Sequence, residues 1–295
     1  MKSIKKNSIG QIVLNAFFII ASITYIIPFV LIISISISDE SAIQQFGYTI
    51  LPKVVSFAGY QAVFKNPAQL IQSYKITAIF SVANTALFLL LCSMAAYPLS
   101  RRNYKIKTPI TWFLFVPCIF SGGLVPTYLL MSKYLHLSDS IWVYIIPGCV
   151  NIWNCFVMRT FFQNLPDGIV EAAKVDGASE VRVLFQILMP LCLPMLASLG
   201  FLHFIAKWND WKTVLYYITD PKLYSLQYLL QKILREQTYL EQMVEEGLMS
   251  TSSTGAPIES MTYAMAILAA GPMLIIFPFF QKYFESGLTI GSVKG

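Results

Sequence analysis

The sequence predicts an all-α, polytopic membrane protein with six transmembrane helices. Of its 295 residues, 56% are hydrophobic and only 12% are charged, and the mean hydropathy is +0.61. Soluble domains usually carry about 25% charged residues. Long apolar runs recur along the chain, and the second run is followed at once by Arg101, Arg102, Lys105 and Lys107. Because positive charges collect on the cytoplasmic side of a membrane, these observations predict a helical bundle folded in lipid, with that loop inside the cell.

The first predicted span covers residues 12–37. Three lysines precede it, but its apolar run is much longer than the roughly 7–15 residues of a signal-peptide core, so we expect a retained helix whose N-terminus is cytoplasmic. Pro28 is expected to kink this helix. The following turn-rich residues, up to 74, are expected to be external. Residues 1–74 are therefore treated as an N-terminal part, and 75–295 as the main transmembrane domain.

The later spans are predicted at residues 76–99, 108–131, 141–158, 184–206 and 261–280. Between them lie an external turn at 132–140, a cytoplasmic loop at 159–183 and an external loop at 207–260, which contains a Ser/Thr/Gly-rich stretch at 250–257. In the third span, two glycines lie between Pro117 and Pro126. This pattern predicts either a break in the helix or a proline kink, and a break at membrane depth must be covered by protein or line a cavity. The last span returns the C-terminus to the cytoplasm.

The residues that are missing limit the possible functions. The six apolar cores contain no Asp, Glu, Lys or Arg. This argues against a proton-coupled carrier, although a sodium site built from backbone carbonyls would escape the test. No G-x-x-x-x-G-K-[ST] motif is present to bind ATP phosphates, so active transport would need a separate energy-supplying subunit. The two histidines, His136 and His203, belong to no enzyme motif that we recognise.

The charges and cysteines give no sign of another kind of site. The formal net charge is +6, but the lysines and arginines flank apolar spans and form no basic helix, so we expect no nucleic-acid partner. All five cysteines lie within or beside apolar runs, and we interpret them as small apolar residues rather than metal ligands or disulfide partners.

The polar segment between the fourth and fifth spans suits a docking element. Asp167 is expected to N-cap a short helix over residues 168–175. The small side chains of Ala172 and Ala173 would leave one face of this helix without bulky groups, so that another protein's backbone can approach closely. Glu171 and Lys174 would place charges beside that face.

The chain is expected to reverse direction just after this helix. Gly177 can adopt positive φ, and Ser179 can cap the helix that leads into the next apolar run. The predicted result is two helices that meet at an elbow, with small residues at its tip.

This segment resembles the signature loop of the membrane subunits of ATP-binding-cassette importers. The family pattern is E-A-A, three residues, Gly, nine residues, Ile, one residue, Leu, Pro. The chain matches it with Glu171-Ala172-Ala173, Gly177, Ile187 and Pro190, and it has Met189 where Leu is usual. The triplet 176–178 and the later Pro194 resemble the carbohydrate-uptake branch, the MalG-like subunits, and the resemblance extends loosely to the ending at 287–295.

The resemblance implies a permease subunit of an ATP-driven importer of sugars or oligosaccharides in the inner (cytoplasmic) membrane. Its loop would be a coupling helix that contacts an ATPase through Glu171, Ala172, Ala173, Lys174, Asp176 and Gly177. The implied partners are a second homologous permease, two copies of the ATPase and an external sugar-binding protein, besides membrane lipid. ATP and Mg would be bound by the ATPase, so no cofactor is expected in this chain.

The resemblance also suggests further contacts and leaves alternatives open. Residues 213–260 are the expected contact with the binding protein, and the tail at 291–295 is expected to reach the ATPase. The chain could instead be a permease for another solute, such as a peptide, a phosphonate or a polyamine. A secondary carrier that works alone is the alternative from another class.

Several polar or aromatic side chains lie within the predicted spans. Sugars are bound by aromatic faces with amide and hydroxyl groups nearby, so the candidate substrate path consists of Asn84, Asn151, Trp153, Asn154 and His203. Asn151 and Asn154 are three residues apart and are expected to share a helix face. Hydrogen bonding between helices is the alternative role for the asparagines, and packing inside the bundle is the alternative for His203.

Overall fold

The computed structural model describes residues 9–246, 248 and 257–292. The described part is helical, and its β structure is a single isolated bridge between Ser38 and Val55. Most of the expected stretch at 250–257 and of the tail at 291–295 lies outside the described residues. The chain divides into two compact units, Met1–Leu70 with Leu230–Gly271, and Ile71–Leu229 with Pro272–Gly295.

The first unit is organised around the N-terminus of its last helix. Its elements are α1 (Ile9–Ser36), α2 (Glu40–Phe46), α3 (Ala58–Val63), the start of α4 (Pro67–Ser100), most of α14 (Leu226–Glu245) and the first part of α15 (Ile258–Ser292). The Glu40 carboxylate accepts hydrogen bonds from the backbone N–H groups of Glu259 at 3.0 Å and Ser260 at 3.2 Å. Gly59 packs so closely that an added Cβ would lie 2.6 Å from the Ser260 backbone. These contacts satisfy the open donors at the start of α15.

The second unit contains the remainder of α4 and all of the elements up to α13. These are α5 (Lys107–Ile119), α6 (Leu124–Leu129), the π-helix η1 (Leu130–Tyr134), α7 (Trp142–Ile145), α8 (Ile152–Asn164), α9 (Asp167–Val175), α10 (Glu180–Arg182), the π-helix η2 (Val183–Leu188), α11 (Met189–Leu191), α12 (Leu193–Trp208), α13 (Lys212–Tyr217) and the 3-10 helix η3 (Pro221–Leu223). The beginning of α14 and the end of α15 complete this unit.

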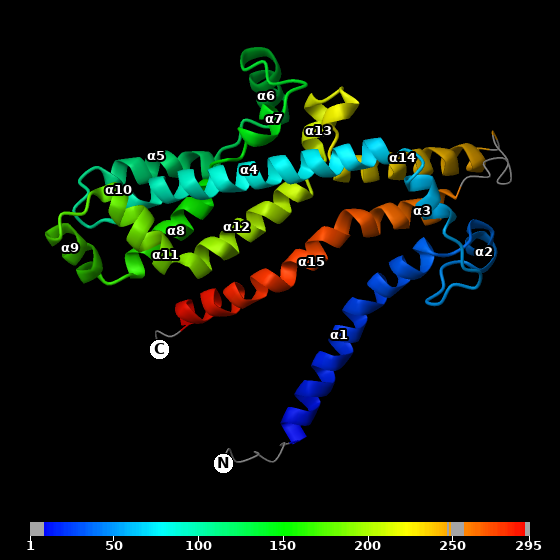
Figure 1. Cartoon of the computed structure of the whole chain (residues 1–295), viewed down its shortest axis with the longest axis horizontal. Helices are drawn as coiled ribbons and strands as arrows, with labels where there is room; N and C mark the ends of the chain where they lie inside the picture. Colours follow the sequence, from blue (N-terminus) through cyan, green and yellow to red (C-terminus); the bar gives the residue numbers. More distant parts are fainter. Residues whose placement is uncertain (1–8, 247, 249–256, 293–295) are drawn as a thin grey trace. The chain divides into compact units, whose positions relative to one another are not determined.

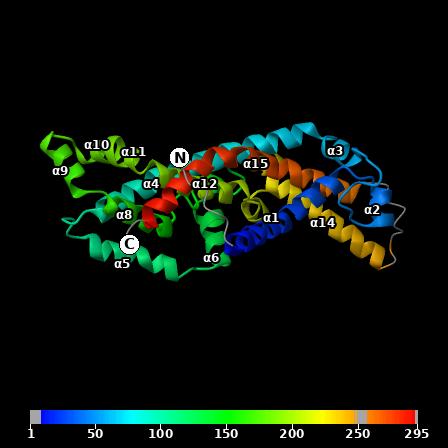
Figure 2. The same ribbon diagram turned by 90° about the horizontal axis from the view of Figure 1, so that it is seen from below.

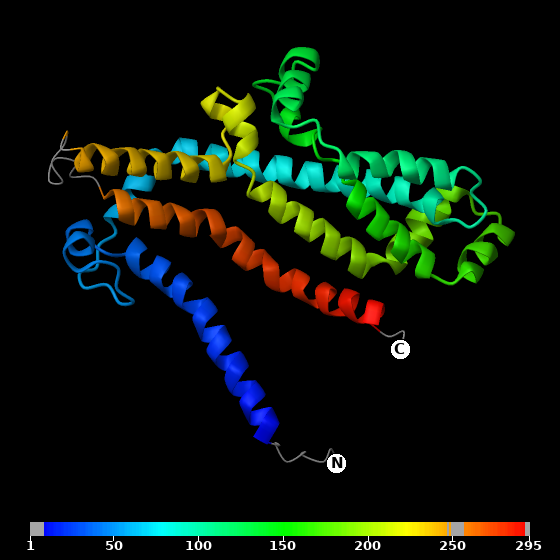
Figure 3. The same ribbon diagram turned by 180° about the vertical axis from the view of Figure 1, so that it is seen from behind.

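Within this unit, α8 packs against α5 and α12. Figure 1 and Figure 2 show α9 and α10 at the same end of the unit as the C-terminus of α4. The largest core cluster joins α4, α8, α9 and α12, and it includes Phe88, Met158, Val183 and Met195. Further along α4, α6 and α13 project on one side (Figure 3), where the rings of Tyr128 and Tyr217 stack at 5.6 Å.

Three described helices are long and apolar enough to cross a membrane, namely Gly10–Ser36, Pro67–Ser100 and Ile258–Tyr283. They coincide with the first, second and last predicted spans. Two more segments qualify as bent pairs, Lys107–Ile119 with Leu124–Tyr134 at 108° and Glu180–Leu191 with Leu193–Trp208 at 84°. The third span is therefore broken between its prolines rather than merely kinked, and the fifth span is broken as well.

Residues 141–158, predicted as the fourth span, do not form the single helix that we expected. They contain α7 and α8, which are separated by a non-helical stretch at 146–151. Gly148 has φ +79° in this stretch, a conformation that glycine adopts readily and that ends a helix. Pro147 before it supplies no N–H to continue the helical ladder. The break shows that residues 141–158 are not one continuous helix, and a membrane pass over them stays a prediction.

Candidate functional site

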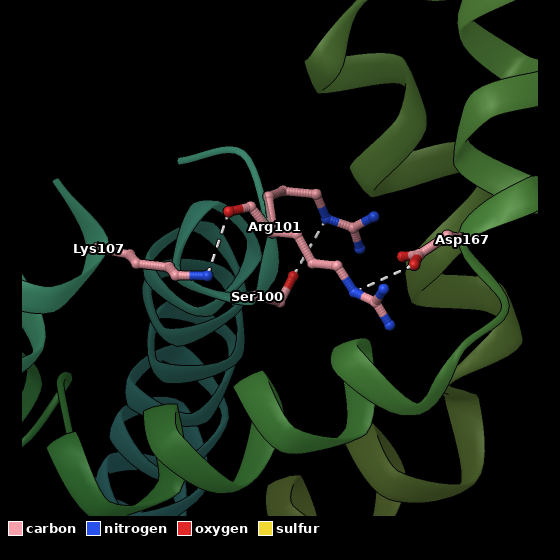
Figure 4. Close-up of polar contacts among 5 residues, drawn as sticks. Ser100, Arg101, Lys107 and Asp167 are labelled. Carbon is pink, nitrogen blue, oxygen red and sulfur yellow. Dashed lines mark hydrogen bonds and ion pairs between the residues drawn. The ribbon is translucent and has the colours of Figure 1, made fainter. Parts of the chain in front are cut away.

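The candidate site is α9 and the end of α4 beside it. Pro166 is the N-cap of α9, and its side chain makes no capping bond. The expectation that Asp167 would be the cap is wrong, because Asp167 is the first residue of the helix itself. Its Oδ2 atom instead lies 3.3 Å from Nε of Arg102, in the loop after α4 (Figure 4). An acidic residue in the first turn still interacts favourably with the positive end of the helix dipole.

The two sides of α9 differ sharply. Val170 and Ala173 are buried in the core cluster, three residues apart on one face. Ala172 is exposed, so the two alanines do not form one outward face. Val175 is 88% exposed at the end of the helix, which is an unusual position for a branched apolar side chain. The helix thus has an inner anchoring face and an outer face that ends in an apolar residue.

A Schellman motif ends α9 and creates the predicted elbow. Gly177 has φ +79°, and its N–H donates to the carbonyl of Lys174 at 3.0 Å, while the N–H of Ala178 donates to that of Ala173 at 2.9 Å. Ser179 then caps the next helix, since its Oγ accepts from the N–H of Arg182 at 3.3 Å. The predictions for Gly177 and Ser179 are both confirmed.

Polar contacts join the elbow to α4. Nζ of Lys174 lies 2.6 Å from Oε1 of Glu180, and the other oxygen of Glu180 accepts a hydrogen bond from the hydroxyl of Tyr97. The guanidinium of Arg101 lies 5.0 Å from the centre of the Tyr97 ring. The sequence analysis missed the pairing of Tyr97 with Glu180 and of Arg102 with Asp167, because the partners lie more than 60 positions apart in the chain.

A cavity of about 700 Å³ opens between α9 and the end of α4. The charged side chains that line it are Arg101, Arg102, Asp167, Glu171, Lys174 and Glu180. Most of these charges pair with one another. Glu171 is exposed, lines this cavity and makes no hydrogen bond or ion pair with the described part of the chain, so its carboxylate acceptors are unused there.

Asn84 and His203 come together, but inside the bundle. The side chain of Asn84 is fully buried, and its Nδ2 donates to the carbonyls of Tyr144, Ile145 and Pro147 at 3.1, 2.7 and 3.3 Å. Its Oδ1 lies 2.6 Å from Nε2 of His203. The Asn84 amide therefore satisfies carbonyl groups that have no helical N–H partner at the break between α7 and α8.

Lys207 and Phe88 complete these contacts. Nζ of Lys207 donates to the carbonyl of Pro147 at 3.0 Å, and the ring of His203 stacks on Phe88 at 4.0 Å. The sequence analysis placed Lys207 at the start of the external loop 207–260. The structure instead gives it a part in supporting the broken helix.

The other candidates on the path lie at the start of α8. Asn151 is the N-cap, and its Oδ1 accepts from the N–H of Asn154 at 3.0 Å, so the two side chains do not share a helix face as expected. Trp153 is 67% exposed. Asn151 and Trp153 line a shallow hollow of about 370 Å³ together with Pro117 and Cys118, and neither Asn84 nor His203 reaches it.

Comparisons with known proteins identify the family. Residues 89–290 match the family described as "Binding-protein-dependent transport system inner membrane component". The polygalacturonan/rhamnogalacturonan transport system permease protein YtcP of Bacillus subtilis (strain 168) is 30% identical over 292 residues, which cover 98% of this chain and 100% of that protein. Protein LplC of the same organism is 34% identical over 270 residues, which cover 92% and 90% of the two chains.

A solved structure has the same fold. A bacterial ABC transporter involved in the import of the acidic polysaccharide alginate contains a chain that aligns with a TM-score of 0.80 and 24% identity, over 96% of this chain and 99% of that one. The likeness supports the fold as a membrane helical bundle. The chain belongs to the family of binding-protein-dependent transport system inner membrane components, and it is a multi-pass membrane permease of an ABC importer rather than an enzyme.

Proposed function

We propose that this permease imports a sugar or an oligosaccharide and that α9 is its coupling helix. The observation that carries the second part is the ion pair of Asp167 with Arg102. Arg102 belongs to the cluster of positive charges that follows α4, and such clusters mark the cytoplasmic side. The contact therefore supports a cytoplasmic position for α9, where an ATPase can reach it.

The shape of α9 suits transmission of force. Its inner face is fixed by the burial of Val170 and Ala173 in the core cluster. Its outer face offers the unpaired carboxylate of Glu171, the small Ala172 and the exposed Val175. Closure of an ATPase dimer around ATP would push on this face, and the bundle would change access from one side of the membrane to the other.

The proposed topology has six passes with both termini in the cytoplasm. It counts each bent pair as one pass and α7 with α8 as another. The break within α7 and α8 is compatible with a position inside the membrane, because Asn84 and Lys207 satisfy carbonyls that lipid could not. In this topology the loop at 132–140 and the segment after α12 are external.

The names of the relatives support a carbohydrate as the substrate. They transport polygalacturonan/rhamnogalacturonan and, for the permease AraQ of Bacillus subtilis, arabinooligosaccharides. In this chain, Trp153 and Asn151 place an exposed aromatic face beside an amide in a shallow hollow. This is the chemistry that a pyranose ring requires, with its apolar face and polar rim. We therefore place the translocation path along the start of α8, with Asn154 beside it and with Asn84 and His203 supporting its wall.

The proposed assembly contains a second homologous permease, two copies of an ATPase that bind ATP and Mg, and an external sugar-binding protein. These partners follow from the kind of importer to which the family belongs. The external elements between α12 and α15 are the proposed contact with the binding protein.

Replacement of Glu171 tests the coupling role. Glu171→Lys is expected to abolish ATP-dependent sugar uptake while membrane insertion stays normal, because the exposed carboxylate would become a cation at the interface. Gln61→Lys, in the exposed external segment, is the control for a lysine introduced elsewhere on the surface and is expected to leave uptake intact. Normal uptake by Glu171→Lys would contradict the coupling role.

Accessibility tests the sidedness of α9 independently. A cysteine introduced at the exposed Ala172 is expected to react with a membrane-impermeant maleimide only when the cytoplasmic face is open. The background is a variant without Cys118, which is the exposed native cysteine. Labelling from outside intact cells would overturn the proposed topology. Sugar uptake by this chain alone in liposomes would overturn the proposed dependence on an ATPase.

A further inference from the structure

The coupling helix is attached at its two ends to the C-terminal part of α4 and to the loop that follows it, neither of which is its neighbour in the chain. At its N-terminus Asp167 contacts Arg102, and beyond its C-terminus Lys174 and Tyr97 meet on Glu180. Tyr97 and Glu180 are 83 positions apart in the sequence. We call Lys174, Glu180 and Tyr97 the clasp. Between the two attachments, the buried face of α9 packs into the core cluster that α4 also lines.

The magnitudes indicate that the clasp positions α9 rather than stabilising the fold. The side chains of Lys174 and Glu180 are 47% and 59% exposed, and an ion pair so exposed to water adds little to stability. Burial of one valine side chain stabilises a fold more than such a pair does, so Val170 does more to hold the helix in place. The clasp instead restrains the rotation of α9 about its buried face.

The helices differ in how well they can carry a displacement. The chain neighbours of α9 lead into breaks, at 146–151 beyond α8 and at the 84° bend before α12. In contrast, α4 is one continuous helix of 34 residues. Bends absorb movement as hinges, whereas a continuous helix transmits it.

The same helix carries Asn84, which holds the break beside the proposed path. Asn84 lies 13 residues before Tyr97, about 20 Å along the axis at 1.5 Å per residue. Its amide binds the carbonyls of Tyr144, Ile145 and Pro147. A displacement of α4 along its axis would therefore move the very group that supports the wall of the path.

We propose that Tyr97, Glu180 and Lys174 are positioning residues that transmit the movement of α9 to α4, and that α4 carries it to Asn84 and the break between α7 and α8. This inference rests on the proposed function, since it takes α9 as the helix that the ATPase moves. It adds a specific route and three residues that do not need to touch either the ATPase or the sugar.

The test is the coupling ratio, the amount of sugar imported per ATP hydrolysed by the whole assembly in proteoliposomes. Glu180→Lys is expected to lower this ratio at least about fivefold, the lower end of typical allosteric coupling, while the ATPase still co-purifies and still hydrolyses ATP. The exchanged pair Lys174→Glu with Glu180→Lys restores the attraction and is expected to recover most of the ratio. An exchanged pair as defective as Glu180→Lys would overturn the ionic part of the clasp.

Tyr97→Phe removes only the hydroxyl and keeps the ring. It therefore tests the role of the clasp even if the charge variants fail to assemble. We expect it to lower the coupling ratio without a change in the amount of assembled complex. An unchanged ratio in Tyr97→Phe would overturn the proposal. Glu171→Lys distinguishes failure of the clasp from failure of the proposed function. If Glu171→Lys transports normally, the coupling role of α9 is wrong. If Glu171→Lys loses transport while Tyr97→Phe has a normal coupling ratio, only the role of the clasp is wrong.

Discussion

The carboxylate of Asp139 binds Thr219 twice, through the backbone N–H at 2.5 Å and through the hydroxyl at 2.6 Å. It also accepts from the N–H of Asp220 at 2.9 Å, and its own N–H donates to the carbonyl of Tyr217 at 2.9 Å. Asp139 adopts φ +53° to do so. One side chain thus fastens the turn at 132–140 to the segment after α13, and both are proposed to be external.

These bonds lower the pKa of Asp139 below its ordinary value, first through the hydroxyl of Thr219 and then through the two backbone N–H groups. Because the pKa of Asp139 is lowered in the folded state, its carboxylate stabilises the fold fully above the ordinary pKa of about 3.9. This stabilisation is lost as the pH falls through the lower pKa of the folded state. We expect this attachment to stay intact between about pH 5 and pH 8.

Asp139→Asn is expected to loosen the attachment near neutral pH, because the negative charge is lost and one acceptor oxygen becomes an NH₂ donor. Hydrogen exchange at the amides of Thr219 and Asp220 measures the effect, and faster exchange is the expected result. Ser138→Ala, at the exposed neighbouring position, is the control. Equal protection in Asp139→Asn and the control would contradict the prediction.

Gly177 tests the elbow by backbone strain alone. Nothing lies within 4 Å of a Cβ built on it, so a side chain has room, but its φ of +79° costs most residues about 1–2 kcal/mol. Asparagine tolerates this conformation and valine does not. We expect Gly177→Asn to keep most of the sugar uptake and Gly177→Val to lose it at equal expression. If both variants transport alike, the positive φ at the elbow does not matter for coupling.

Gly148 and Gly177 form a matched pair. Both have φ +79°, so alanine at either position places a Cβ on a positive-φ backbone. A Cβ on Gly148 would in addition lie 3.0 Å from Nζ of Lys207 and push it from the carbonyl of Pro147, whereas a Cβ on Gly177 meets nothing within 4 Å. Gly148→Ala is therefore expected to cost about 1.5–3 kcal/mol more than Gly177→Ala in thermal unfolding in detergent, the worth of one hydrogen bond to a charged group. Equal losses would mean that the bond from Lys207 adds nothing to the break.

The sequence alone predicted the features that local chemistry determines. Apolar length gave α1, α4 and α15, the prolines at 117 and 126 gave a break or kink, and the need for positive φ identified Gly177. The break at 146–151 was not predicted: Pro147 and Gly148 mark it locally, but the group that satisfies its carbonyls, Asn84, lies about 60 positions away. No periodicity in a linear sequence reports such a partner.

The misplaced cap at Asp167 has the same cause. Its residue type is right for an N-cap, but Pro166 takes the cap position and a distant Arg102 takes the carboxylate. Local preference was overridden by a tertiary contact, and the pairing of Lys174 with Glu180 was likewise beyond what the signature pattern describes.

Replacement of Asn84 distinguishes a structural role of this side chain from a contact with the substrate. Asn84→Leu keeps the approximate size of the side chain but withdraws the donor from three carbonyls and the partner from His203. We expect a loss of about 2 kcal/mol in thermal unfolding, since each buried group left unsatisfied costs about 1–3 kcal/mol and part of this is recovered by other partners in a membrane.

His203→Phe provides the comparison within the same contact. A phenyl ring can keep the stacking on Phe88 and removes only the bond to Asn84, which is worth about 0.6–1.7 kcal/mol in a membrane protein. The double variant with Asn84→Leu is expected to lose less than the sum of the two, because both single changes break the same bond. If Asn84→Leu unfolds like the unmodified protein and yet has lost sugar uptake, its amide acts on the substrate directly. The account of Asn84 as the support of the broken helix would then have to be abandoned.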